Sequence, residues 1–395
     1  MVQLIHPHPG QAAILNARSR FRVVACGRRF GKTETGKILL VEIALRGGRT
    51  WWLSPTYGMA SQVWRDLKAA LHGDQTQISE TERRIDLSTG GSISIRSTHT
   101  PELLRGAGLD FAVLDEAAFM PPEVWPQVVR PMLADRKGGA LFLSSPNGRN
   151  WFWEVFKLGL DPEATEWRSF HFTTADNPLI DHAELEAIRR TTPERVWRAE
   201  YLAEFSEDAG AVFRGIREAA TAPTDVQPSP GGRRIMGVDW GRDRDYTCLV
   251  ILDADSGHML ALDRFNQIGW ELQRGRLMAL YETWKPSVIW AEANSIGAVN
   301  IEALQNAGLP VRAFQTTASS KAPLIEALAL AIERREIALL PDPVLLNELA
   351  SYALERLPGG GYRYSAPPGG HDDTVIALAL AWHGARYSGS GVDFA

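Results

Sequence analysis

A short apolar run at residues 21–25, a glycine-containing loop and a stretch of helical periodicity constrain the fold of this chain more than any other feature. The order predicts a strand, a tight loop and a helix, as in an α/β domain. The backbone N–H groups of such a loop can surround phosphates, while Lys32 reaches the β- and γ-phosphates and the Thr33 hydroxyl binds Mg²⁺. The spacing departs from the usual pattern, because Cys26 occupies the position of the first glycine and Gly27 follows one place later. An ordinary strand-to-helix turn is the alternative. The residues expected around a nucleotide are Gly27, Arg28, Arg29, Phe30, Gly31, Lys32 and Thr33.

A second apolar run, residues 111–114, ends in Asp115 and Glu116. Continuous apolarity is typical of a strand buried on both faces of a parallel sheet, and ligands collect at the carboxyl ends of such strands. We therefore expect Asp115 to hold Mg²⁺ through water and Glu116 to polarise the water that attacks the γ-phosphate. Two acids after a strand are common in α/β proteins, so this prediction depends on the Gly-Lys-Thr loop upstream. Together the two motifs predict ATP hydrolysis.

Two other features of the first half are candidates for nucleotide sensing. Ser144 and Ser145 follow an apolar run that ends at Leu143, and their hydroxyls are expected beside the γ-phosphate, where they can report hydrolysis. A Ser-Pro-Asn-Gly turn is an equally good interpretation. Gln11 precedes the loop, and its amide can both donate to and accept from an adenine edge. A glutamine at the start of a helix is the alternative.

The second half also places acids at the ends of predicted strands. Three apolar runs predict a meander whose first strand ends at Asp239, a fourth strand ends at Glu292, and a last helix opens with Asp372 and Asp373. Two Mg²⁺ or Mn²⁺ ions about 3.5–4 Å apart need carboxylates that converge from several elements, as in two-metal nucleases. Solvated strand ends and helix N-caps are the alternative, and the sequence does not decide which of the two neighbouring aspartates binds metal. The predicted strands are 234–239, 246–252, 258–265 and 287–292.

The composition, 45% hydrophobic and 23% charged residues in a chain of 395, is typical of a globular protein long enough for two domains. No apolar stretch approaches the roughly 18 residues of a membrane helix, so we expect a cytoplasmic protein without a membrane partner. The two cysteines exclude a disulfide framework and a cysteine zinc site, and the net charge of −5 neither favours nor excludes nucleic acid. A Pro-, Ser- and Gly-rich stretch before residue 233 marks a domain boundary. The expected parts are a P-loop domain at 1–205 with a helical lid at its C-terminal end, a linker at 206–232, a nuclease domain at 233–386 and a flexible tail at 387–395.

With both halves in view, the sequence resembles the large terminase subunit of tailed bacteriophages from Pro9 to about Trp382. The motifs that carry the resemblance stand in the family's order: Arg28-Arg29-Phe30-Gly31-Lys32-Thr33, Ser54-Pro55-Thr56-Tyr57, Leu114-Asp115-Glu116, the coupling motif Ser144-Ser145-Pro146, and the acids Asp239, Glu292 and His371-Asp372-Asp373. The resemblance implies an α/β chain in which a P-loop ATPase domain of the additional-strand, catalytic-glutamate type precedes a nuclease domain with the ribonuclease H fold.

The resemblance also implies roles for single residues. Gln11 matches the adenine-sensing glutamine, although Gly10 replaces the aromatic residue that often precedes it. Arg105 lies where some members carry an arginine finger that enters a neighbouring subunit's ATP site, whereas others use an arginine of the phosphate loop, here Arg28 or Arg29. A surface arginine is the alternative for Arg105. Lys321 lies where a lysine can meet a DNA phosphate, and a helix-start lysine is an equally good interpretation.

The function implied is ATP-driven translocation of double-stranded DNA into procapsids, with metal-dependent endonucleolytic cleavage of concatemeric viral DNA. The implied ligands are ATP, Mg²⁺ at the ATPase site and two Mg²⁺ or Mn²⁺ ions at the nuclease site. Implied partners in the host cytoplasm are the portal protein, the small terminase subunit and further copies of the chain in a ring. One alternative is a helicase-like or repair ATPase whose second domain binds DNA without cutting, which the four acids oppose. Another is an assembly protein that binds nucleotide without turnover, which Glu116 opposes.

Overall fold

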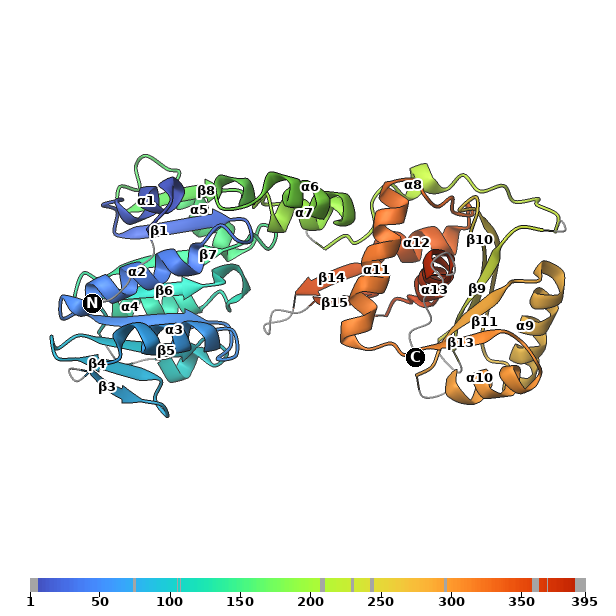
Figure 1. Ribbon diagram of the computed structural model, residues 1–395, viewed down its shortest axis with the longest axis horizontal. Coiled ribbons are helices and arrows are strands. Elements are labelled where there is room, and N and C mark those ends of the chain that lie inside the picture. Colours follow the sequence, from blue (N-terminus) through green and yellow to red (C-terminus); the bar gives the residue numbers. More distant parts are fainter. Residues whose placement is uncertain are drawn as a thin grey trace. The chain divides into compact units, whose positions relative to one another are not determined.

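The computed structural model describes residues 6–73, 76–104, 106, 108–206, 210–228, 231–241, 245–294, 297–356, 362–367 and 369–387. The chain divides into two compact units, of which the first consists mainly of residues 1–209 and the second mainly of residues 210–395. Both units pack helices against a largely parallel or mixed sheet (Figure 1), so the expectation of an α/β chain is confirmed. Among the helices of the described residues, none combines the length and apolarity needed to cross a bilayer.

The first unit is built on an eight-stranded sheet in the order β3-β4-β5-β2-β6-β7-β1-β8. From β5 to β8 all neighbouring strands are parallel, and β3 and β4 add an antiparallel edge. The strands are β1 (Phe21–Cys26), β2 (Arg49–Ser54), β3 (Thr76–Ser79), β4 (Arg84–Leu87), β5 (Ser92–Ser97), β6 (Phe111–Asp115), β7 (Gly139–Ser144) and β8 (Trp167–Phe172). The helices are α1 (Pro9–Leu15), α2 (Lys32–Leu45), α3 (Ser61–Leu71), α4 (Arg130–Met132), α5 (Trp151–Leu158), α6 (His182–Thr191) and α7 (Glu194–Glu200).

Strand β7 lies between β1, which leads into the phosphate loop, and β6, which ends in the two acids. This inserted strand is what the additional-strand class of ATPase implies. The order brings the carboxyl ends of β1, β7 and β6 side by side at one edge of the sheet. Alternate residues of β1 pack into two separate apolar layers, with Val23 on one face and Val24 on the other. The central strands therefore need the continuous apolar runs seen in the sequence.

The second unit is built on a five-stranded sheet in the order β11-β10-β9-β12-β13, in which β9, β10 and β11 form the predicted antiparallel meander and β12 and β13 run parallel to β9. The strands are β9 (Arg234–Asp239), β10 (Thr247–Asp253), β11 (Met259–Phe265), β12 (Val288–Glu292) and β13 (Val311–Phe314), with a separate hairpin of β14 (Ala353–Arg356) and β15 (Tyr362–Ser365). The helices are α8 (Ile216–Ala219), α9 (Trp270–Trp284), α10 (Gly297–Asn306), α11 (Ala318–Glu333), α12 (Pro343–Ser351) and α13 (Asp373–Tyr387).

Helix α13 lies directly on one face of this sheet, while α9 and α10 cover the other (Figure 1). A Cβ atom at Gly237 of β9 would collide with the carbonyl oxygen of Ala377, so glycine permits the close approach of the helix. All ten α13 residues from Asp373 to Trp382 are buried, which explains why this stretch is apolar without helical periodicity. The approach places the start of α13 over the carboxyl end of β9.

Part of the predicted linker at 206–232 packs into the second unit. Val212 and Phe213 are almost fully buried in its core, and the backbone of Ala222 donates a hydrogen bond to the carbonyl of Leu339. The domain limits given above stay a prediction.

Both cysteines lie in the cores, Cys26 at the end of β1 and Cys248 in β10. Burial raises the pKa of the Cys26 thiol to about 12, and burial likewise raises the pKa of Cys248.

Candidate active sites

The phosphate loop between β1 and α2 is held from outside by side chains that donate to its carbonyl oxygens. Thr174 Oγ1 donates to the carbonyl of Arg28 at 2.8 Å, Asn177 Nδ2 to that of Arg29 at 2.6 Å, and Gln11 Nε2 to that of Gly31 at 3.0 Å. In a trans peptide the carbonyl and the next N–H point in opposite directions, so the first and third of these bonds turn the N–H groups of Arg29 and Lys32 away from the supporting side chains, while Phe30 N donates to the Gly27 carbonyl. The loop is thereby shaped to receive an anion.

Glycine is required twice in this loop. Gly31 has φ +100°, a left-handed conformation that glycine adopts without strain. A Cβ atom at Gly27 would collide with the carbonyl of Tyr201 and with Thr174. Gly27 therefore lets the loop pack against the segment that follows α7. Phe30 points inward instead, fully buried and stacked on Phe172 with ring centroids 4.6 Å apart.

The acids after β6 lie next to the lysine of the loop. Lys32 Nζ is 3.2 Å from Glu116 Oε1, and both side chains are largely buried. Burial opposes the charge of Lys32, but neighbouring anionic groups, first of all Glu116, outweigh it and raise the lysine pKa. Burial, and then the charge of Glu116, raises the pKa of Asp115 to about 7. Asp115 Oδ1 is buried without a hydrogen-bond partner, so this carboxylate oxygen is available to coordinate Mg²⁺.

The two serines at the end of β7 connect these acids to a buried glutamate that the sequence analysis missed. Ser144 Oγ donates to Glu116 Oε2 at 3.4 Å, and Ser145 Oγ donates to Glu200 Oε2 at 3.2 Å. The same oxygen of Glu200 lies 2.9 Å from Arg28 Nε. Glu200 is only 3% exposed, although it ends a helix of mixed polar character and reads as a surface acid in the sequence.

A cavity of about 660 Å³ opens above the loop and includes Arg28, Arg29, Lys32, Thr33 and Glu116 in its lining. This volume lies in the range of small-molecule sites. Asn177 and Ile180 line the same cavity from the segment after β8.

Gln11 lies behind the loop, buried to 5% exposure, and both ends of its amide are occupied by backbone groups, since His8 N donates to its Oε1 at 3.1 Å. Its predicted contact with adenine stays a prediction. Arg105 lies outside the described residues, so the choice between Arg105, Arg28 and Arg29 as the finger also stays a prediction.

In the second unit, the predicted acids converge on one end of the sheet. Asp239 ends β9, Glu292 ends the neighbouring strand β12, and Asp373 opens α13. Asp239 and Asp373 are each 7% exposed. Burial, then the charge of Glu292 and a hydrogen bond to it, raises the pKa of Asp239 well above its usual value, and Asp373 and Asp372 act in the same direction.

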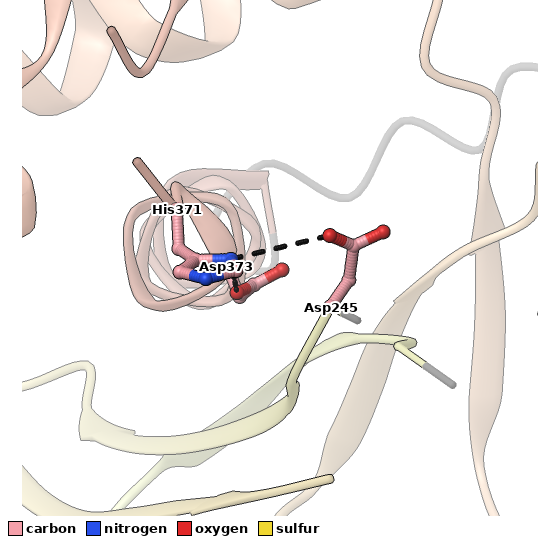
Figure 2. A group of neighbouring side chains, drawn as sticks. All are labelled: Asp245, His371 and Asp373. Carbon is pink, nitrogen blue, oxygen red and sulfur yellow. Dashed lines mark ion pairs between the residues drawn. The ribbon is translucent and has the colours of Figure 1, made fainter. Parts of the chain in front are cut away.

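A carboxylate absent from the sequence prediction joins this group. Asp245, just before β10, has a carboxylate oxygen within 4.8 Å of ligand atoms of His371 and Asp373. His371 Nδ1 lies 3.6 Å from Asp373 Oδ2 and 4.0 Å from Asp245 Oδ1, and Figure 2 shows the three side chains turned toward one another. Asp373 Oδ2 is buried without a hydrogen-bond partner, and burial raises the pKa of this carboxyl to about 6. Crowded, partly unsatisfied carboxylates of this kind fit divalent cations.

Asp372 and Lys321 form a direct pair at the same site. Lys321 Nζ lies 3.1 Å from Asp372 Oδ2, and Asp372 is more exposed than its neighbour Asp373. The structure therefore gives the two aspartates different surroundings: Asp373 faces His371 and the sheet, whereas Asp372 faces the lysine. Which of them binds metal stays a prediction, as does the contact of Lys321 with DNA.

A buried hydrogen-bond network holds Gly241, two residues after Asp239. Thr247 Oγ1 accepts from Gly241 N at 2.9 Å and donates to Gln273 Oε1 at 2.7 Å, while Gln273 Nε2 donates to the carbonyls of Gly241 and Ile268. Gln273 is fully buried in α9. A polar side chain held in this way fixes the backbone at the end of β9, because each of its groups would be costly to leave unpaired.

Two family models match this chain one after the other. The family model "Terminase large subunit, T4likevirus-type, N-terminal" matches residues 24–220, and the model "Terminase RNaseH-like domain" matches residues 236–383. The expected ribonuclease H-like fold of the second half is thereby confirmed.

Curated relatives match this chain over most of its length. The large terminase subunit of Thermus virus P23-45 is 30% identical to this chain, in an alignment that covers 97% of this chain and 88% of that protein. The large terminase subunit of Escherichia phage T5 is 31% identical over 280 residues, 65% of this chain and 63% of that protein. Among solved structures, a large terminase from a thermophilic bacteriophage covers 95% of this chain and 98% of its own with a TM-score of 0.56, and at 16% identity it shows the shared fold.

Proposed function

The chain belongs to the family of terminase large subunits, and from that premise we propose which residues carry its two activities, ATP hydrolysis coupled to DNA translocation and endonucleolytic cleavage of DNA. In this proposal the phosphate loop and the acids after β6 hydrolyse ATP, and the acids at the ends of β9, β12 and the start of α13 cut DNA. Two observations support it: the contact of Lys32 with Glu116 at 3.2 Å, and the convergence of neighbouring carboxylates on the buried Asp239.

In the ATPase site, Lys32 and the loop N–H groups bind the phosphates of ATP, and Thr33 and Asp115 hold Mg²⁺. Glu116 orients the attacking water and accepts its proton. Arg28, which lines the cavity, is the residue that we propose stabilises developing charge on the transferring phosphoryl group. Ser144 and Ser145 contact Glu116 and Glu200 respectively, so they can relay a change at the γ-phosphate to α7.

In the nuclease site, Asp239, Glu292, Asp373 and Asp372 are the proposed ligands of two Mg²⁺ or Mn²⁺ ions, with Asp245 as an additional ligand. Such ions activate a water nucleophile and stabilise charge on the scissile phosphate. The protein's part is to hold carboxylates from separate elements in one place. Lys321, 3.1 Å from Asp372, is the proposed contact for a DNA phosphate beside these acids.

The finer biological setting is also part of the proposal. We place the chain in the host cytoplasm, acting on concatemeric double-stranded DNA with the portal protein, the small terminase subunit and further copies of itself in a ring. Family membership supports these partners.

A reciprocal pair of variants tests the assignment of the two activities. Lys32→Ala should lower DNA-stimulated ATP turnover at least about 100-fold, because it removes the cation on the phosphates, and should leave plasmid cleavage with Mn²⁺ intact. Asp239→Ala should abolish cleavage of supercoiled plasmid and leave ATP turnover within about two-fold of the wild type.

Persistent nicking by Asp239→Ala would refute the nuclease assignment. If a folded wild-type chain hydrolyses ATP but does not cut DNA, the result supports the alternative, an ATPase whose second unit only binds DNA.

A further inference from the structure

A buried glutamate on α12 caps the helix that carries the nuclease aspartates. Glu348 is 7% exposed, and its Oε2 accepts hydrogen bonds from Thr374 N at 2.9 Å and Thr374 Oγ1 at 2.5 Å. Thr374 directly follows Asp373 in the first turn of α13. A carboxylate at a helix N-terminus satisfies an N–H group that lacks a partner within the helix and interacts favourably with the helix dipole. The start of α13 is therefore anchored from a neighbouring helix, α12.

The other oxygen of Glu348 pairs with an arginine on the sheet. Arg264 NH2 lies 3.2 Å from Glu348 Oε1, with both side chains largely buried. In the strand register, Arg264 of β11 is opposite Cys248 of β10, which is opposite Asp239 of β9. Because paired residues of adjacent strands share a face, the three side chains form one row on the α13 side of the sheet. The ion pair thus connects the sheet row of Asp239 to the turn that begins with Asp373.

Arg264 also contacts the segment that bears Asp245. Its guanidinium carbon lies 3.3 Å from the ring centroid of Tyr246, the residue after Asp245. The Tyr246 and His371 rings form a T-shaped contact, with ring centroids 5.2 Å apart and planes at 87°. One arginine therefore touches both Glu348 under α13 and the aromatic residue beside Asp245.

A buried ion pair contributes little net free energy to folding, because the cost of desolvating both charges offsets much of their attraction. Its directional hydrogen bonds do fix geometry. At this site Glu348 contacts Thr374, which is next to Asp373 in the chain. Arg264 contacts Tyr246, which is next to Asp245.

We propose that Glu348 and Arg264 are positioning residues, which lock the first turn of α13 to the β10–β11 side of the sheet and so set the spacing of Asp373 and Asp245 from Asp239 for divalent cations. The inference rests on the nuclease function proposed above. Neither residue is assigned to bind metal or DNA. Outer groups of this kind commonly affect metal affinity 10- to 100-fold.

The test measures Mn²⁺ binding to the full chain by calorimetry, together with the Mn²⁺ concentration that gives half-maximal plasmid cleavage. Glu348→Ala and Arg264→Met should each raise the dissociation constant for Mn²⁺ and the half-maximal concentration about 10- to 100-fold. ATP turnover should stay unchanged. Arg264→Lys, which retains a charge without the planar guanidinium, should fall between wild type and Arg264→Met.

The matched control is Arg276→Met. Arg276 forms a two-pronged pair with Asp263, the residue before Arg264 on β11, with distances of 2.5 and 3.0 Å, and both partners are more exposed. Removing this pair should change Mn²⁺ affinity less than two-fold.

A double variant separates positioning from stability. Replacing both partners by methionine removes the unpaired charge that a single substitution leaves behind, so the melting temperature should recover toward that of the wild type. Mn²⁺ affinity should remain low if the pair sets ligand spacing. Recovery of both melting temperature and affinity in the double variant would overturn the proposal. So would wild-type affinity in a folded Glu348→Ala chain.

If Glu348→Ala does not fold, Glu348→Gln decides instead. It retains an oxygen for Thr374 but loses the charge that pairs with Arg264, and it should weaken Mn²⁺ binding several-fold. Unchanged affinity in this variant also overturns the proposal. A wild-type chain that binds no Mn²⁺ and cuts no DNA would contradict the nuclease function itself. If the wild type binds Mn²⁺ and cuts DNA and the variants behave in the same way, only the positioning role is contradicted.

Discussion

Single residues in this chain hold conformations that ordinary packing does not require. Glu116 has φ +57°, in the left-handed region that residues with side chains rarely adopt. Such conformations cost about 1 kcal/mol or more and collect at functional sites. Here the left-handed turn at the end of β6 directs the carboxylate toward both Lys32 and Ser144. The backbone strain therefore serves to aim the proposed catalytic carboxylate.

Replacing Glu116 by glutamine should separate ATP binding from hydrolysis. The amide retains the shape of the side chain but cannot accept a proton from water, so we expect turnover to fall at least about 100-fold while the dissociation constant for ATP changes less than about three-fold. Steady-state ATPase rates and binding of a fluorescent ATP analogue measure the two quantities. Glu42→Gln, in an exposed ion pair with Arg46 on α2, is the control and should alter neither. Unchanged turnover in Glu116→Gln would contradict the assigned role.

Asp245→Asn should raise the Mn²⁺ concentration that cleavage requires rather than abolish cleavage. Asp245 is exposed, and it contributes one of several carboxylates to the group with His371 and Asp373. Losing its charge should raise the Mn²⁺ concentration for half-maximal cleavage about ten-fold, with a smaller change in the maximal rate. A titration of plasmid cleavage against Mn²⁺ measures both. If the titration curve is unchanged, Asp245 does not take part in the metal site.

The site residues that the sequence predicted differ from those that it missed in whether the neighbouring sequence distinguishes them. Asp239 and Glu292 follow apolar strands, and the polarity change at a strand end is visible in the sequence. Asp245 stands in a polar stretch between strands, where an acid has no distinguishing neighbour. Glu200 and Glu348 lie in helices with mixed polarity, and only the tertiary packing shows that they are buried.

At the scale of elements, the strands that the sequence predicted lie close to their observed bounds, because apolar runs bounded by turn residues have few alternative structures. The meander of β9, β10 and β11 and the strand before the phosphate loop are examples. The segment after residue 209 shows where this reasoning stops. The Pro, Ser and Gly content of residues 221–232 indicated a linker at 206–232. Val212 and Phe213, which precede that stretch within the predicted linker, are nevertheless core residues, since two apolar side chains can be buried without any periodic pattern.

His383, in the C-terminal part of α13, should make the free energy of unfolding of the second unit depend on pH. Burial, and then Arg386, lowers the pKa of His383 to about 4, and the ring packs edge-on against Trp290 with centroids 4.7 Å apart. An unfolded histidine titrates near 6.5, so the unfolded chain takes up the proton first. The contribution of the neutral ring is fully present above pH 6.5 and is lost as the pH falls from 6.5 toward 4.

Between pH 7 and pH 5, the free energy of unfolding of the second unit should therefore fall by about 1 kcal/mol more in the wild type than in His383→Gln, after allowance for solvent screening. Urea unfolding at the two pH values measures the difference. Equal pH dependence in both proteins would show that His383 is protonated equally well in the folded and unfolded states.

For the whole molecule, the division into two compact units with separate sheets predicts separate responses to ligands. A non-hydrolysable ATP analogue with Mg²⁺ stabilises only the unit that binds it, and at 100 times its dissociation constant adds about 2.7 kcal/mol. For units of this size that corresponds to a shift of roughly 5–10 °C. Calorimetry of the full chain should show two transitions, one raised by the analogue and the other by Mn²⁺. A single transition that moves with either ligand would contradict independent units.

The burial of both thiols has a practical consequence for observing this protein at work. Cys26 and Cys248 are the two cysteines of the sequence, and each is fully enclosed with a pKa raised by burial. Thiolate is the form that maleimide dyes attack, so the native chain should remain almost unlabelled under mild conditions. A cysteine introduced at an exposed position in either unit would then be the single reactive handle. Pairs of such handles would allow fluorescence energy transfer to follow the distance between two chosen points during each round of ATP hydrolysis, without first rebuilding either core.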